Sequence, residues 1–161
     1  MKGVFYRFLL YIILVTFSFY LGYCNFSVGI SLGNPTGISL KLQSQKKLVY
    51  DLVTNFSSDP QYFYLHCDFL RYDYEKIVSK ELTGKFPVFY GIGLKIENVG
   101  EENRLGFRFV IGLEYIFADI PFEIFFKLAP YINIVPSTAV GIAPSIGIRY
   151  IFKWQHLKKF F

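Results

Sequence analysis

Charged residues are scarce in this chain. Asp, Glu, Lys and Arg make up 18% of its 161 residues, whereas hydrophobic residues make up 53%. A typical soluble domain carries about 25% charged residues. A soluble domain of this size needs a larger share of charged residues than 18% to cover a surface that faces water. The composition therefore argues against an ordinary soluble globular domain and favours a surface that partly faces an apolar medium.

Cysteines and catalytic motifs are also missing or few. The two cysteines, Cys24 and Cys67, are too few for a disulfide framework, and Cys67 is expected to serve as a small hydrophobic residue. The sequence contains no G-x-S-x-G, H-E-x-x-H, P-loop or C-x-x-C pattern. We therefore expect no enzymatic activity, no cofactor and no metal site.

The net charge of +5 does not indicate a nucleic-acid partner. Its excess lies at the two ends of the chain, and no basic stripe with interleaved aromatics occurs between them, so we expect no nucleic-acid binding. The terminal basic residues are Lys2, Arg7, Lys153, Lys158 and Lys159.

The first 24 residues have the pattern of an export signal. Two basic residues, Lys2 and Arg7, precede an uncharged run over 8–24, which matches the n-region and h-region of a secretory signal. We predict that residues 1–24 are a signal segment that is cleaved. Two alternatives remain open: Leu21–Cys24 resembles a lipobox, with Cys24 lipidated, or the run is an uncleaved anchor near the lower length limit of about 17 residues.

From Asn25 onward the dominant period is two. In the segment 104–117 the odd positions, Leu105 to Phe117, are all apolar, whereas the even positions carry small or charged residues such as Arg108 and Glu114. Successive side chains of a strand point to opposite faces, so this alternation predicts a strand with one apolar face. Turn residues divide the body into eight such segments: 25–33, 36–43, 47–57, 61–72, 85–97, 104–117, 121–133 and 139–152.

The polar faces of the eight segments carry five positive and five negative charges, interspersed with glycines. A soluble lipocalin-type barrel would show the same period with its polar face outward. Glycines and balanced charges instead fit the crowded interior of an eight-stranded barrel, and the apolar face then meets lipid. We expect an outward face without charge. The ten charged residues are Lys41, Asp51, Asp68, Lys95, Glu97, Arg108, Glu114, Glu123, Lys127 and Arg149.

These patterns predict an all-β fold, a closed antiparallel eight-stranded transmembrane β-barrel with meander topology over residues 25–152. Residues 153–161 form a C-terminal extension. The longest connection is expected at Tyr74–Gly84. Pro130 and Pro144 are expected roughly opposite each other across a turn near Ser137, which predicts a bulged or frayed rim because each lacks a ladder donor.

The last segment ends in Ser145–Phe152, where Gly147, Tyr150 and Phe152 resemble the C-terminal β-signal of outer-membrane proteins. Together with Gly33–Gly37 and Tyr90–Gly93, this resembles the small OmpA/OmpX-like eight-stranded barrels, including uncharacterised spirochaete (Borrelia) members. The resemblance implies an outer-membrane location, a monomer with both termini in the periplasm, and recognition by the outer-membrane assembly machinery.

The candidate site is a lumenal charge network formed by Arg108, Glu114, Glu123, Lys127 and Arg149, with His66 and Asp68 as a further lumenal pair. The favoured function is a structural or surface-interaction barrel that binds a host or envelope partner through its rims, with the lumen plugged by paired charges. The alternatives are a narrow pore and a soluble carrier of an apolar ligand. An outer-membrane hydrolase would need a serine and a histidine on matching rims, for which Ser137 and His66 are available but not selected by any motif.

Overall fold

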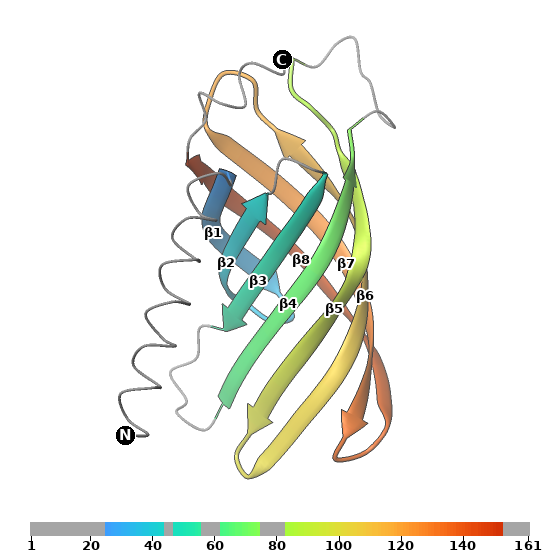
Figure 1. Cartoon of the computed structure of the whole chain (residues 1–161). Helices are drawn as coiled ribbons and strands as arrows, with labels where there is room; N and C mark the ends of the chain where they lie inside the picture. Colours follow the sequence, from blue (N-terminus) through green and yellow to red (C-terminus); the bar gives the residue numbers. More distant parts are fainter. Residues whose placement is uncertain (1–24, 44–46, 56–61, 75–82, 153–161) are drawn as a thin grey trace, which may run out of the picture.

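The computed structural model describes residues 25–43, 47–55, 62–74 and 83–152, so the predicted signal segment and C-terminal extension lie outside the described residues. Eight antiparallel strands pair in chain order and close into a barrel (Figure 1), which confirms the predicted fold class. The described residues include no helix of the length and apolarity needed to cross a membrane. The strands are β1 (Asn25–Gly33), β2 (Gly37–Gln43), β3 (Leu48–Asn55), β4 (Tyr62–Asp73), β5 (Val88–Val99), β6 (Glu102–Ile116), β7 (Phe122–Val135) and β8 (Ala139–Phe152).

The barrel closes where β1 pairs with β8, from Phe26↔Phe152 to Gly33↔Ser145. A path that steps from each residue to its register partner leaves β8 at Arg149, circles the barrel and returns to β8 at Ala139, ten residues earlier. A stagger of this size in an eight-stranded sheet tilts the strands by about 40°. The resulting interior is narrow enough for side chains to fill.

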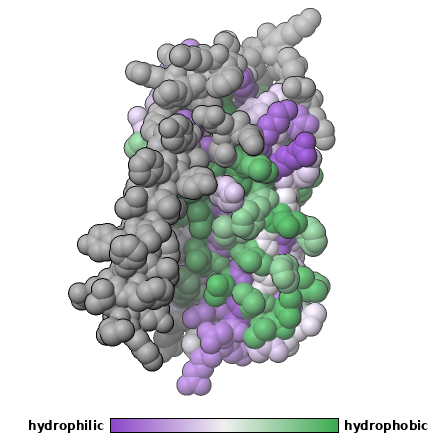
Figure 2. Space-filling view, in the orientation of Figure 1, coloured by the Kyte–Doolittle hydropathy of each residue, from purple (hydrophilic) through white to green (hydrophobic). Residues whose placement is uncertain are grey.

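The two faces of the sheet are opposite in polarity to those of a soluble protein. Thirty large apolar or aromatic side chains among the described residues are exposed, for example Phe109 at 61% and Ile111 at 57%. Charged side chains of the strands are buried instead, among them Arg149 and Lys127. Figure 2 shows apolar side chains over the visible middle of the wall, with hydrophilic ones gathered toward its two ends.

The two ends of the barrel differ. Strands β1 to β3 have 7–9 residues, whereas β4 to β8 have 12–15, so the β5–β6 and β7–β8 hairpins extend beyond the β1–β2 turn at the lower end of Figure 1. The starts of β1 and β5 and the ends of β4 and β8 share the opposite end. Of the predicted long connection Tyr74–Gly84, only residues 74, 83 and 84 are described.

The two prolines lie roughly opposite each other across the β7–β8 ladder, two positions out of register: Pro130 pairs with Ile142 and Pro144 pairs with Leu128. The β6–β7 ladder has no pair at Phe109 or Val110, next to Pro130, which has no N–H to donate, although the register is the same on both sides of this gap. Pro144 costs no such bond, because it lies beyond the last β1–β8 pair and its carbonyl accepts from the Asn34 N–H at 3.2 Å. The register shift of the β6–β7 ladder lies at Leu105/Gly106, away from both prolines.

Two further details correct the sequence-based expectations. The fifth strand begins at Val88 rather than at residue 85, because Pro87 lacks a donor, although its carbonyl accepts from the Glu114 N–H at 3.0 Å. The outward face is not free of charge: Arg71, the third residue from the end of β4, is exposed on it. Its register partners are Leu48 and Tyr90, toward the end of the barrel where β1 begins and β8 ends.

Candidate functional site: the lumenal charge network

Nine charged side chains from seven strands are buried inside the barrel, five cations and four carboxylates. Burial of one unpaired charge in so dry a space is costly, so the geometry of their pairing determines whether the arrangement is stable. The nine residues are Lys41, Asp51, Asp68, Lys95, Arg108, Glu114, Glu123, Lys127 and Arg149.

Lys41 of β2 reaches across the lumen to two carboxylates. Its Nζ lies 2.6 Å from Glu114 Oε1 and 2.7 Å from Glu123 Oε2. The second carboxylate oxygen of Glu114 accepts a hydrogen bond from the Tyr72 hydroxyl at 2.8 Å. The cation thus separates two carboxylates that would otherwise repel each other.

Arg149 of β8 connects the same carboxylates to a third one. Its Nη2 lies 2.7 Å from Asp51 Oδ2, and its Nη1 lies 3.3 Å from Glu123 Oε1 and 3.5 Å from Glu114 Oε2. Its Nε donates to Ser39 Oγ at 2.9 Å. The guanidinium carbon also lies 3.8 Å from the centroid of the Phe125 ring. A planar fork of donors suits this position, because one side chain serves several oxygens.

A second part of the network surrounds Asp68. Lys127 Nζ lies 2.8 Å from Asp51 Oδ2 and 3.9 Å from Asp68 Oδ2, which connects the two parts. Arg108 Nε lies 3.0 Å from Asp68 Oδ1. The Arg108 partner is therefore a carboxylate on β4, and not Glu114 or Glu123; the two side chains meet over Gly93 of β5, the register partner of both residues.

His66 is held in the lumen by Arg108 and Asp68. Its Nδ1 lies 2.8 Å from Arg108 Nη1, which is always a donor, so Nδ1 accepts and the ring proton is placed on Nε2. That Nε2 lies 3.4 Å from Asp68 Oδ2. Arg108 Nη1 also donates to the Tyr64 hydroxyl at 3.0 Å. With both nitrogens directed at lumenal partners and the ring buried, His66 is not placed on a rim with Ser137, as a hydrolase would require.

The two parts of the network differ in how well their polar atoms are satisfied. Among the described residues, His66 Nε2, Arg108 Nε and both Asp68 carboxylate oxygens have close charged neighbours but no well-aligned hydrogen bond. All carboxylates around Lys41 and Arg149 accept aligned bonds. The part around Asp68 is therefore the less completely paired one.

Toward the end of the barrel formed by the β5–β6 and β7–β8 hairpins, the last lumenal pair is more accessible. Lys95 Nζ lies 3.2 Å from Glu97 Oε2 and 3.8 Å from the centroid of the Tyr131 ring. The Glu97 side chain keeps 15% of its surface exposed.

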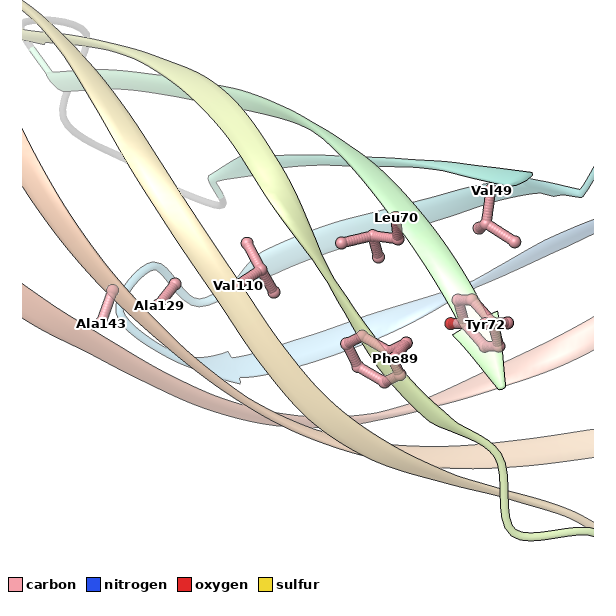
Figure 3. Close-up of a cluster of buried hydrophobic side chains, with 7 residues drawn as sticks. All are labelled: Val49, Leu70, Tyr72, Phe89, Val110, Ala129 and Ala143. Atoms are coloured by element: carbon pink, nitrogen blue, oxygen red, sulfur yellow. The ribbon is translucent and has the colours of Figure 1, made fainter. Parts of the chain in front are cut away.

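Apolar side chains fill the rest of the lumen next to the charges. Figure 3 shows them pointing inward from β3 to β8, in contact with one another. Glycines on this face make room for large neighbours: a Cβ at Gly112 would meet the Phe89 ring, and one at Gly93 would meet Asp68 and Arg108 side-chain atoms. The cluster comprises Val49, Leu70, Tyr72, Phe89, Val110, Ala129 and Ala143.

The seven candidate lumenal residues from the sequence are all inside the barrel, but their network has more members. Lys41 and Asp51 also belong to the network, and the sequence indicated them only by their position on the polar face. Nothing in the sequence predicted that Tyr72 and Ser39 would form hydrogen bonds with the charged side chains. Among the described residues no group of three or more His, Cys, Asp or Glu side chains is arranged to hold a metal ion.

The three residues of the predicted β-signal lie on both faces of β8. Gly147 faces the Phe125 ring in the lumen, whereas Tyr150 and Phe152 are exposed outward with ring centroids 5.0 Å apart. Phe152 also stacks on Phe26 of β1 at 4.5 Å, so this motif forms part of the closing seam. Its recognition by assembly machinery stays a prediction.

Comparisons with known proteins add little to this geometry. No model of a known protein family matches the chain, and no curated protein matches it. A solved structure, described as the crystal structure of Neisserial surface protein A (NspA), is similar with 9% sequence identity and a TM-score of 0.44, over 80% of this chain and 94% of that one. A similarity at this level does not assign a function, which has to be argued from the barrel itself.

Proposed function

We propose that this chain is a small outer-membrane barrel with a plugged lumen, which acts as a structural or surface-interaction protein through its rims. The observation that supports it best is the inverted polarity: charged side chains are buried inside while Phe109, Ile111 and Ile146 are exposed on the wall. In lipid, a closed barrel satisfies every backbone group and an apolar outer wall needs no water. A soluble carrier is disfavoured, because it needs an apolar lumen and a charged exterior.

The pairing of lumenal charges supports a plug rather than a pore. Lys41 of β2 contacts Glu114 of β6, and Arg149 of β8 contacts Asp51 of β3, so these contacts cross the lumen. The Arg149–Glu123 contact joins register partners on adjacent strands. A pore would be favoured by unpaired lumenal charge of one sign. The five buried cations face four buried carboxylates, and the fifth carboxylate, the partly exposed Glu97, pairs with Lys95, so the lumen has no excess of one sign.

If the lumen transports nothing, interactions have to occur at the ends. The β5–β6 hairpin presents the exposed Glu101 and Glu102 and the partly exposed Arg104 near its tip, with Glu102 and Arg104 paired at 2.9 Å. By the resemblance to OmpA/OmpX-like barrels, this end faces outward and the termini face the periplasm. A host or envelope protein would then meet a charged hairpin next to the uncharged β7–β8 hairpin. The resemblance to Borrelia members and the monomeric state belong to the same proposal.

Fractionation tests the location. The full chain with residues 1–24 is expected in the outer-membrane fraction, with an unboiled gel band that shifts on heating. Mass spectrometry of the mature protein is expected to show loss of residues 1–24, whereas a diacylglycerol mass on Cys24 would establish lipoprotein processing. Recovery of the mature protein as a detergent-free soluble species would overturn the proposal.

A further inference from the structure

Arg71 is an unusual residue on this wall. It is exposed on the outward face of β4, where Phe69 precedes it and Asp73 follows it, and no ion pair to it occurs within the described residues. Its register partners Leu48 and Tyr90 are also exposed. Leu48 is the first residue of β3 and Arg71 lies two residues from the end of β4, which places Arg71 near the rim where β1 begins and β8 ends.

An apolar groove begins at Arg71 and continues along the wall over β4, β5 and β6. It is a shallow, open groove with a volume of about 510 Å³. Phe69, Ile92 and Phe109 line the part away from the rim, so the groove runs from a cationic end into the apolar band. Arg71 is the charged residue among its lining residues.

We propose that Arg71 and this groove form a binding site for one glycerophospholipid of the leaflet next to the rim where β1 begins and β8 ends. The site rests on the proposed function, since it requires that the wall lies in a membrane. The lipid phosphate accepts hydrogen bonds from the Arg71 guanidinium, whose planar fork matches phosphate oxygens. One acyl chain lies in the groove against Phe69 and Ile92.

A second groove on the wall has a similar apolar lining but no arginine. It has a volume of about 600 Å³ and is lined by Pro130, Ile132, Val140 and Ile142 among others, without a charged side chain. It lies near the opposite end, on β6 to β8. Such a groove can hold acyl chains but offers no cation to a phosphate, so it provides an internal control.

The test is native mass spectrometry of protein extracted from membranes in mild detergent, with three probes. Dipalmitoyl phosphatidylglycerol has chains and phosphate, dipalmitoylglycerol has the same chains without phosphate, and glycerol phosphate has no chains. The wild type is expected to retain phosphatidylglycerol in preference to the other two. Arg71→Gln should reduce that retention about fivefold, the effect of one cation near a lipid surface, and Arg71→Lys should restore part of it.

Matched variants separate this site from general lipid coating. Leu48→Ala is expected to weaken phosphatidylglycerol and dipalmitoylglycerol alike, whereas Ile142→Gln in the second groove should leave the phosphate preference unchanged. Equal retention by wild type and Arg71→Gln, both recovered as heat-modifiable barrels, would overturn the lipid site and leave the barrel proposal intact. Retention of glycerol phosphate as strong as that of the lipid would also overturn it, in favour of a free-phosphate site.

Discussion

Lys41 Nζ and Glu114 Oε1 lie 2.6 Å apart across the lumen, although the two residues are 73 positions apart in the chain. Lys41 is on β2 and Glu114 on β6, strands that share no ladder. The contact therefore connects walls that backbone hydrogen bonds do not join. Together with the Arg149 contacts, it makes the lumen a source of stability for the closed barrel.

Glu114→Gln is expected to destabilise the barrel by about 3–5 kcal/mol. The substitution removes the carboxylate that faces Lys41 and Arg149 and leaves buried cations with less compensation. Urea unfolding of the refolded protein in detergent measures the change. The exchanged pair Lys41→Glu with Glu114→Lys should recover part of the loss.

Glu97→Gln is the matched control for that substitution. Glu97 pairs with Lys95 near the mouth and remains partly exposed, so its loss should cost about 1 kcal/mol or less. Stability that is indifferent to Glu114→Gln, or equally sensitive to both changes, would contradict a network that stabilises the barrel.

Ile111→Arg should block assembly into the membrane, whereas Ile120→Arg should be tolerated. Ile111 is exposed in the middle of β6, where an arginine facing lipid costs about 2–4 kcal/mol, falling to about 0–1 near the interface. Ile120 has similar exposure but lies in the β6–β7 connection. The heat-shifted fraction on unboiled gels measures assembly. Equal assembly of both variants would mean that the wall does not face lipid.

The strand pattern could be predicted from sequence because period-two alternation is a local signal. The bounds of β1 and β8 agree with the predicted segments, and the others differ by a few residues, mostly where a proline or turn decides the end, as Pro87 does for β5. The inward placement of Glu114 and Arg149 follows from the same alternation.

The partners inside the lumen could not be predicted, because they depend on the stagger and diameter of the closed sheet. Arg108 meets Asp68 of β4 rather than the carboxylates of β6 and β7, because both residues are register partners of Gly93, which has no side chain to separate them. Arg71 was not predicted as an outward-facing residue for a different reason: the outward face was expected to carry no charge, whereas this arginine is exposed on it near the end of β4.

Gly29→Ala is expected to weaken the closing seam by about 1–3 kcal/mol, the usual cost of overpacking. An added Cβ would overlap the backbone of Ile148 and Arg149 on β8, which cannot move without shifting the ladder. Ser31→Ala is the control, because Ser31 is buried on the same face of β1 and only a hydroxyl is lost. Urea midpoints that drop equally for the two variants would contradict a specific role of Gly29 in closure.

Conductance separates the plug from the pore, and Arg149 is the residue that tests it. The wild type is expected to give no ion-selective channels in planar bilayers, because Arg149 and Lys41 connect three carboxylates across the lumen. Arg149→Ala removes a fully buried side chain and leaves Asp51, Glu114 and Glu123 with less positive charge around them. Any leak through this variant should therefore prefer cations.

Arg104→Ala is the control: it removes a rim arginine paired with Glu102 and should leave the membrane as tight as the wild type does. Both variants are first checked for the heat-shifted band, so that misfolded protein is not read as a channel. Stable, reproducible single channels from the wild type would defeat the plug and favour the narrow pore.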